Sequence, residues 1–375
     1  MKEILLVSWR ELLLVLGSFG TLWQEVVEIR FSGPRARQST MIALSTALSV
    51  VVALALHMDY VWWAGISGFM SMQATRPGSI NRALLRIAGT IAGACLAILL
   101  TPWVAYDHVA GSLLVFAFAT LGILGYQVSP HNFAWLFAAI TVNLIVMSSL
   151  QDPTLAFHYA FYRTAEVAIG SAVALLVAFA LAPDGGASAP APPGWSQLLG
   201  RDWPRVLHAL RCGLTVMLLP WVWSWFNQLS LSQMSVTVAV IMAVPVAPGD
   251  PLESGRRVAS QSLQRVMGCF IGGVAGLLLL ALSLTTFLPW LLALSAVLWV
   301  GAYIQTSTRG VGYFGTQAAL VLIMTLVQGW GPPDSILPGI ARFGGMIAAL
   351  GVLMVVSLIF WPEAPKSATS APAAN

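Results

Sequence analysis

Twelve apolar stretches, each roughly 15 to 24 residues long, divide this chain. A helix needs about 20 residues to cross a bilayer core about 30 Å thick, so each stretch predicts a membrane-spanning helix. Charged residues make up only 9% of the chain, against about 25% in soluble proteins. The predicted fold is an all-α membrane protein. The spans are expected near residues 39–56, 61–75, 86–101, 110–126, 133–150, 160–182, 209–226, 232–247, 266–284, 287–304, 313–328 and 338–361.

The stretches form two sets of six that repeat each other. A shift of 179 positions carries Arg86, Gly89 and Gly93 onto Arg265, Gly268 and Gly272. The same shift carries Arg163 onto Arg342 and Pro183 onto Pro362. Two copies of an even number of spans share one orientation, so the sequence predicts two parallel six-helix repeats, related by an axis along the membrane normal.

The basic residues predict which way the repeats face. With the amino terminus inside, only Arg163 and Arg342 fall on the outer side. Short loops rich in Lys and Arg stay in the cytoplasm. Both termini are therefore expected in the cytoplasm, and the protein is expected in a bacterial inner membrane.

The remaining segments predict the domain boundaries. Residues 1–38 contain Arg10 and Glu11 within an apolar run, which favours an amphipathic helix on the cytoplasmic surface; a thirteenth span is the alternative. The first repeat occupies residues 39–183 and the second 209–362. Residues 184–208, rich in Pro, Gly and Ala at their start, predict a cytoplasmic linker, and residues 363–375 a disordered tail.

Several kinds of function find no support in the sequence. No nucleophile and base pair, phosphate-binding loop or metal-ligand cluster can be assembled, so we expect no enzyme, no cofactor and no metal site. The Arg residues are scattered over short loops instead of forming one basic face. A nucleic-acid partner is therefore not expected either.

The third span of each repeat carries a glycine pattern. Gly89 and Gly93 recur in the first repeat, as Gly268 and Gly272 do in the second. Small residues at every fourth position make a flat groove that a neighbouring backbone can approach closely. These glycines predict helix packing and say nothing about a substrate.

Basic residues in the spans are candidates for anion binding. Arg86 and Arg265 lie one turn before the glycines and could attract an anion from the cytoplasm. The alternative is an anchor at the inner boundary whose charged end reaches water. Arg163 and Arg342 present the same choice at the outer boundary.

A single carboxylate, Glu166, lies within the predicted spans. An acid inside a membrane is a candidate for proton coupling. Because Glu166 follows Arg163 by three residues, a salt bridge between the two is the alternative. Gly345 stands at the corresponding place after Arg342, so Arg342 is expected to be free to meet an anionic ligand.

The second span of each repeat is short or interrupted by Gly or Pro, which in repeat-built transporters points to the substrate site. Packing through small polar residues explains the same pattern. The polar residues expected on the path are Ser67, Ser71, Gln73, Ser232, Gln233, Ser235 and Thr237.

Residues 40–97 carry a family resemblance. Trp62 and Trp63 open the second span, a short polar turn follows it, and an R-x-x-G-T-x-x-G pattern runs from Arg86 to Gly93. In these features the chain resembles the fusaric acid resistance and aromatic acid exporter family of inner-membrane proteins. The likeness extends over both repeats, the second being more divergent.

The resemblance implies proton-driven efflux of aromatic carboxylic acids or similar small toxic compounds, with a small organic anion as substrate. Relatives often work with a periplasmic membrane-fusion adaptor, so an adaptor is an expected partner besides the lipid bilayer. Self-association of the chain is a separate expectation. Many relatives have a large cytoplasmic domain between the halves, where this chain has only the short linker. A passive organic-anion channel, as in distantly similar plant proteins, and a non-transporting membrane scaffold are the alternatives.

Overall fold

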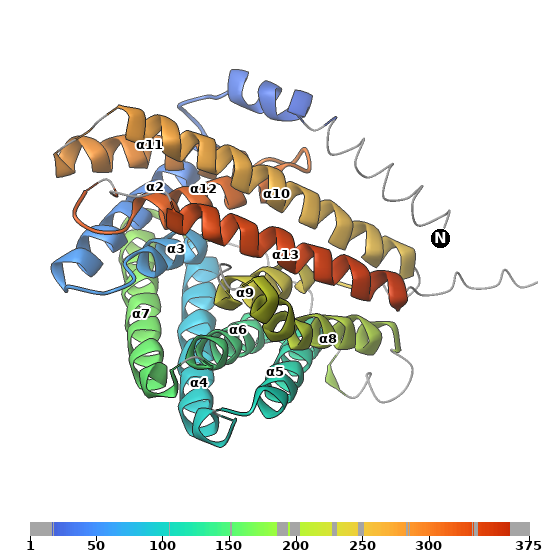
Figure 1. Ribbon diagram of the computed structural model, residues 1–375. Coiled ribbons are helices and arrows are strands. Elements are labelled where there is room, and N and C mark those ends of the chain that lie inside the picture. The colour runs from blue at the N-terminus through green and yellow to red at the C-terminus, as the bar shows by residue number, and fades with distance from the viewer. Residues whose placement is uncertain are drawn as a thin grey trace, which may run out of the picture.

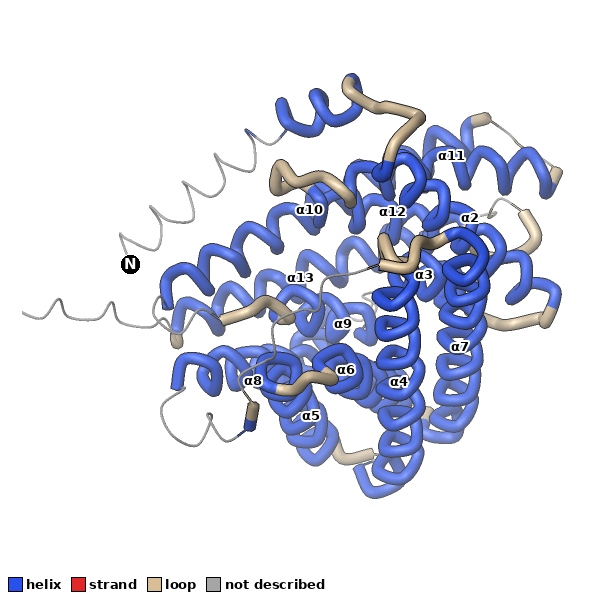
Figure 2. Tube along the Cα trace, turned by 180° about the vertical axis from the view of Figure 1, so that it is seen from behind, coloured by secondary structure: helices blue, strands red, loops and turns tan. Residues whose placement is uncertain are grey.

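The computed structural model describes residues 17, 19–104, 106–150, 152–185, 194–195, 203–226, 231–246, 251–282, 284, 286–331, 333 and 337–360. The predictions for residues 1–16, for most of the linker and for the tail lie outside this part of the chain. The described residues form helices joined by short loops and include no strand (Figure 1; Figure 2 shows the same from behind).

In the described part of the chain, each half contributes six α-helices to the bundle. The first half has α2 (Pro34–Ala55), α3 (Trp62–Ser71), α4 (Arg76–Val104), α5 (His108–Val128), α6 (Asn132–Ser149) and α7 (Ala156–Leu181), with a short 3₁₀ turn, η1 (Pro153–Leu155), before α7. The second half has α8 (Trp203–Phe226), α9 (Leu231–Met242), α10 (Pro251–Ala281), α11 (Phe287–Gln305), α12 (Gly312–Leu326) and α13 (Leu337–Ile359).

The predicted all-helical membrane class is confirmed, but not the twelve full-length spans. Within the described part of the chain, nine helices are long and apolar enough to cross a membrane. The helices α3, α9 and α12 have only 10, 12 and 15 residues. In α9 the cause is Pro245, which disfavours helical geometry at the residue before it. After α3, the side-chain amide of Gln73 bonds the carbonyls of Met70 and Met72.

Other helices start earlier than predicted. α4 begins at Arg76 and α10 at Pro251, although the apolar stretches begin near residues 86 and 266. α8 begins at Trp203, so residues 203–208 of the predicted linker are helical. Each of these helices has a proline in its first two positions, where its fixed φ suits a helix start. Hydropathy finds the part of a helix that lies in lipid and misses its polar first turns.

The two halves pack in matching ways. α4 packs on α6 as α10 packs on α12, and α3 packs on α2 and α7 as α9 packs on α8 and α13. Between the halves, α5 packs on α8 and α2 packs on α11. In Figure 1 the pair α4 and α7 runs in a clearly different direction from α10 and α13.

The glycine pattern lies where α4 meets α6 and where α10 meets α12. A Cβ at Gly89 would lie 2.3 Å from the carbonyl oxygen of Ala134, and one at Gly93 would lie 2.5 Å from that of Ala138. A Cβ at Gly272 would lie 2.3 Å from the oxygen of Ala318, and Gly268 is similarly close to Phe314. The backbones approach so closely that only glycine fits.

A short helix over residues 17 and 19–27 lies outside the bundle (Figure 1). Leu22 packs on Ile304, Val311 and Phe314 near the start of α12. Trp23, on another face of this helix, is 70% exposed. The helix therefore rests on the bundle by one face and leaves an apolar face uncovered.

Glu25 fastens this helix to the bundle. Its carboxylate lies 2.6 Å from Nη2 of Arg35 and accepts a hydrogen bond of 2.8 Å from Ser307. Burial raises the pKa of Glu25, but the hydrogen bonds from Arg35 and Ser307 and the charges of Arg35 and Arg309 outweigh it, and the pKa is lowered. The carboxylate is thus held in its charged form.

Candidate functional site

Arg163 on α7 and Arg342 on α13 line one cavity of about 250 Å³. They are the equivalent residues of the two halves. The other residues that line the cavity come from the start of α3, from α6, α7 and the start of α9: Tyr60, Trp62, Trp63, Leu144, Ser148, Tyr159, Ser232 and Gln233. The fold therefore brings two cationic side chains from distant parts of the chain to one site.

Each arginine stacks on an indole ring. The Cζ atom of Arg163 lies 3.6 Å from the ring centroid of Trp63, and that of Arg342 lies 4.5 Å from the ring centroid of Trp62. Adjacent residues of a helix point about 100° apart. Trp63 therefore meets the arginine of its own half, while Trp62 meets the arginine of the other half. Such stacking stabilises a cation that has been removed from water.

Arg163 is buried, and two of its guanidinium nitrogens make no hydrogen bond in the described structure. Its side chain is 3% exposed, and Nε and Nη1 have no hydrogen-bond partner within the described residues. A guanidinium can donate five hydrogen bonds in a planar fork that matches a carboxylate. The site is therefore suited to an anionic ligand that reaches these nitrogens.

The predicted salt bridge between Arg163 and Glu166 is wrong, because no ion pair within 4 Å joins these two side chains in the described structure. Glu166 is fully buried, and its Oε1 accepts a hydrogen bond of 2.6 Å from the backbone N–H of Tyr60. Its Oε2 is buried without a partner. The two side chains share a helix face, but the ring of Trp63 and the N–H of Tyr60 draw them apart.

Arg342 has no carboxylate partner among the described residues, but one of its nitrogens is hydrogen-bonded. Its Nη1 donates a hydrogen bond of 2.5 Å to the carbonyl of Met324, in the last turn of α12. The carbonyls of a last helical turn have no partner within their own helix, so a cation is favoured there. Arg342 is held in place by this bond and by Trp62.

Tyr60 adds a hydroxyl to the site. It lies in the loop before α3, and burial, together with nearby Tyr159, Asp59 and Glu166, raises the pKa of Tyr60 to about 12. The phenol therefore keeps its proton at neutral pH and remains a possible donor to an anion. Its ring packs edge-on against Trp62, with the centroids 5.2 Å apart.

The polar residues of the short helices divide into two groups. Ser232 and Gln233 line the cavity. The others face neighbouring helices or their own backbone. Ser67 and Ser235 donate to carbonyls of their own helices, and Ser71 lies 3.2 Å from Ser171 on α7. Gln73 donates to the carbonyls of Met70 and Met72 at the end of α3, and Thr237 accepts a bond from Arg265.

Arg86 and Arg265 lie elsewhere in the bundle. Arg86 is 3% exposed, and its Cζ lies 4.2 Å from the ring centroid of Phe137 on α6. Arg265 donates to Gln317 at 2.8 Å and to Thr237 at 3.2 Å. Neither residue lines the Arg163–Arg342 cavity. For Arg86, burial argues against an anchor whose charged end reaches water.

The tryptophan partners of the arginines were not predicted from the sequence. Trp62 and Trp63 are visible there as an adjacent pair at the start of a span, which is also typical of an interfacial belt. Tyr60, Tyr159 and Ser148 carry no signal of their own. A repeat alignment could have pointed to Arg163 and Arg342, but no pattern says which aromatic rings cover them.

Comparison with known proteins assigns part of the chain to a family. Residues 47–177 match the family described as fusaric acid resistance protein-like, which confirms the resemblance over the segment from α2 to α7. That segment includes Trp62, Trp63, Arg163 and Glu166. No curated protein and no solved structure matches the chain.

Proposed function

From the match to the fusaric acid resistance protein-like family, a family of membrane transporters, we propose that this chain is an inner-membrane efflux transporter subunit for aromatic carboxylic acids. The observation that carries this proposal is the pairing of Arg163 and Arg342 in one cavity beside two indole rings. The family match supports transport, and the cavity supports an aromatic anion as the substrate.

The chemistry of the cavity suits such a substrate. A carboxylate placed between two guanidinium groups would receive charge-assisted hydrogen bonds from the free nitrogens of Arg163. The substrate ring would lie near Trp62, Trp63 and Tyr159, because aromatic pairs prefer offset or edge-on contacts. The cavity of about 250 Å³ is small for a ligand site, which favours a single-ring acid.

We further propose that α3 crosses the membrane together with the extended residues that follow it. Tyr60 meets Glu166 near the middle of α7, and Arg76 forms an ion pair of 2.7 Å with Asp184 beyond its end. Ten helical residues and four extended ones span about 28 Å, close to the length of α7 between these contacts. The predicted six crossings in the first half are thus retained.

The same reasoning applies to α9. Gln233, near its start, lies in the cavity with Arg342, while the side chain of Gln127 at the end of α5 bonds the backbone of Val244 and Val246. We propose that both halves point the same way, with both termini in the cytoplasm. The matching helix contacts and the distribution of basic residues support this arrangement, and the lengths of α4 and α10 favour tilted helices.

Glu166 is the proposed proton-coupling residue. It is buried close to the cavity, and its Oε2 has no hydrogen-bond partner in the part of the chain that the structure describes. A periplasmic membrane-fusion adaptor and self-association remain expectations from the family resemblance.

Reconstituted vesicles test the proposal directly. Purified protein in vesicles loaded with radiolabelled benzoate should release it faster when a pH gradient is imposed. Arg342→Gln should reduce the rate about tenfold, whereas Arg256→Gln, an exposed arginine outside the cavity, should leave it unchanged. Release that is insensitive to the gradient would favour a passive channel, and an absence of protein-dependent release would favour a scaffold.

A further inference from the structure

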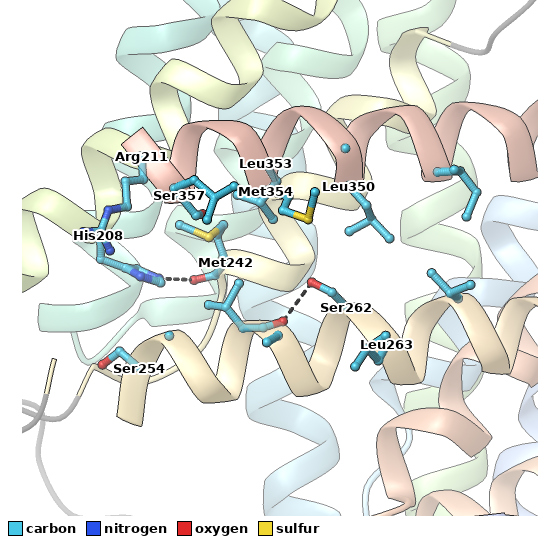
Figure 3. Close-up of a pocket in the computed structure, with 17 residues that line it drawn as sticks. His208, Arg211, Met242, Ser254, Ser262, Leu263, Leu350, Leu353, Met354 and Ser357 are labelled. Atoms are coloured by element: carbon cyan, nitrogen blue, oxygen red, sulfur yellow. Dashed lines mark hydrogen bonds between the residues drawn. The ribbon is translucent and has the colours of Figure 1, made fainter. Parts of the chain in front are cut away.

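The second half of the chain contains an opening that the first half lacks. In the first half α4 packs against α7 along much of its length, and Ala174 and Ala178 of α7 are fully buried. The equivalent helices α10 and α13 make few contacts with each other. A cavity of about 520 Å³ lies between them and reaches α8 and α9 (Figure 3).

A sequence difference between the halves accounts for the opening. Arg76, at the start of α4, pairs with Asp184 at 2.7 Å, and its N–H bonds the carbonyl of Pro183 at 3.1 Å. The shift of 179 positions places Gly255 at the corresponding point of α10. Glycine has no side chain that could form the equivalent ion pair from α10.

The cavity is polar at one end and apolar along the rest. In Figure 3 His208, Arg211 and Ser254 lie at the same end of the cavity, with His208 between the other two, while Leu263 and Leu350 lie toward the other end. Among the described residues that line the cavity, Arg211 is the one side chain with a permanent charge. This layout matches a molecule with an anionic head and an apolar tail.

Two polar groups at the charged end have no partner in the described structure. Ser254 is 7% exposed, and its Oγ makes no hydrogen bond. Nε of Arg211 is buried without a partner, although Nη2 bonds the carbonyl of Phe360. At the equivalent of Ser254 in the first half, Thr75 accepts a bond from Gly78 at 3.4 Å. A buried polar group without a partner is costly, so a ligand with an anionic group at this end of the cavity is favoured.

His208 does not share this role. Its Nε2 lies 2.8 Å from the carbonyl of Met242, so this nitrogen is occupied as a donor. The anion would therefore be held by Arg211 and Ser254.

We propose that this cavity binds a single-chain anionic amphiphile of the fatty-acid type. Its carboxylate lies at Arg211 and Ser254, and its chain runs between α10 and α13. One cation and one elongated gap suit one headgroup and one chain. The site shares no residue with the Arg163–Arg342 cavity and is separate from the proposed transport function.

Photolabelling of the purified full-length protein in detergent tests the proposal. Palmitate with a diazirine in its chain should label peptides from α10 and α13. Gly351 lines the cavity, and a Cβ there would meet nothing within 4 Å. Gly351→Phe should therefore fill the cavity without a clash and reduce labelling about tenfold.

Matched variants guard against indirect effects. Gly273 also has open space around its Cβ but does not line the cavity, so Gly273→Phe should retain labelling. Arg342→Gln, in the other cavity, should also retain it. Labelling that survives Gly351→Phe, or that is lost in Arg342→Gln, overturns the proposal.

The charge of the headgroup is tested separately. A diazirine analogue of hexadecanol should label several-fold less than palmitate, and Arg211→Gln should remove this difference. Should Arg211→Gln fail to fold, Ser254→Ala should still weaken palmitate labelling. Equal labelling by the alcohol overturns the anionic assignment. Labelling by photoreactive phosphatidylglycerol alone overturns the single-chain assignment.

Discussion

Glu166 Oε1 accepts a 2.6 Å hydrogen bond from the backbone N–H of Tyr60, which lies 106 residues earlier in the chain. This bond connects the middle of α7 to the loop that leads into α3, whose first two residues are Trp62 and Trp63. The carboxylate thus fixes the start of the helix that carries both indole rings of the Arg163–Arg342 cavity. A movement of Glu166 on protonation would therefore shift the positions of those rings.

Glu166→Gln separates the structural role of this residue from its proton-coupling role. The amide oxygen can still accept the bond from Tyr60, so we expect thermal unfolding in detergent to stay close to that of the original protein. Efflux driven by a pH gradient should fall about tenfold, because the group can no longer exchange a proton. Unchanged gradient-driven efflux would leave Glu166 with a structural role alone.

Glu166→Ala removes the acceptor and should destabilise the protein by about 1–3 kcal/mol, since the buried N–H of Tyr60 loses its partner. Glu28→Gln alters an exposed carboxylate and serves as the control. Thermal unfolding of the two variants side by side gives the comparison.

Trp62 and Trp63 should differ in their effects. Trp62→Leu removes the ring beneath Arg342 of the other half, whereas Trp63→Leu uncovers Arg163, which is 3% exposed and lacks partners at two nitrogens. We expect Trp63→Leu to be the more destabilising, by about 2 kcal/mol or more, because a desolvated cation loses its stacking partner. Unfolding in detergent measures this, and equal losses would argue against the stacking account.

Gly272 and Gly273 offer an internal comparison on one helix. A Cβ at Gly272 would lie 2.3 Å from the oxygen of Ala318, while a Cβ at Gly273 would meet nothing within 4 Å. Gly272→Ala should destabilise the protein by about 1–3 kcal/mol through overpacking. Gly273→Ala should be neutral or stabilising by up to about 1 kcal/mol, because alanine is the better helix former. Similar unfolding temperatures for both would contradict the close approach of α10 and α12.

The helix over residues 19–27 should detach in acid. The pKa of Glu25 is lowered from 4.5, chiefly because hydrogen bonds from Arg35 and Ser307 outweigh burial. The stabilisation is therefore complete above pH 4.5 and is lost as the pH falls through the lowered value. Quenching of Trp fluorescence by acrylamide should increase over that range. In Glu25→Gln the quenching should already be high at neutral pH, and a pH-independent signal in the original protein would refute the assignment.

Cysteine labelling tests the proposed orientation. Arg256→Cys and Asp184→Cys should react only when an impermeant reagent reaches the cytoplasmic side of membrane vesicles, and Asp107→Cys only from the other side. Reaction of Arg256→Cys and Asp184→Cys from opposite sides would show that the halves do not point the same way.

The sequence by itself determined the helical membrane class and the approximate places of the apolar helices, and it showed that one shift of 179 positions relates Arg163 to Arg342. These features can be found from sequence because they are local or periodic: hydropathy shows which residues lie in lipid, and spacing shows which residues recur. Gly and Pro in the second spans also predicted that α3 and α9 are short or interrupted, but the sequence did not show where each helix ends, because apolar composition is shared by helix and extended chain.

Only the tertiary structure decided the partners of the buried charges. Spacing on α7 predicts a pair between Arg163 and Glu166. Instead, Arg163 stacks on the ring of Trp63, and Glu166 accepts a hydrogen bond from the backbone of Tyr60. The tertiary structure also showed that α10 and α13 lie apart where α4 and α7 pack together. Gly255 stands in α10 at the position that Arg76 holds in α4. A buried donor, acceptor or ring can interact with any neighbour that the fold brings within reach. Its partner therefore depends on contacts between residues more than a hundred positions apart, which local sequence spacing does not show.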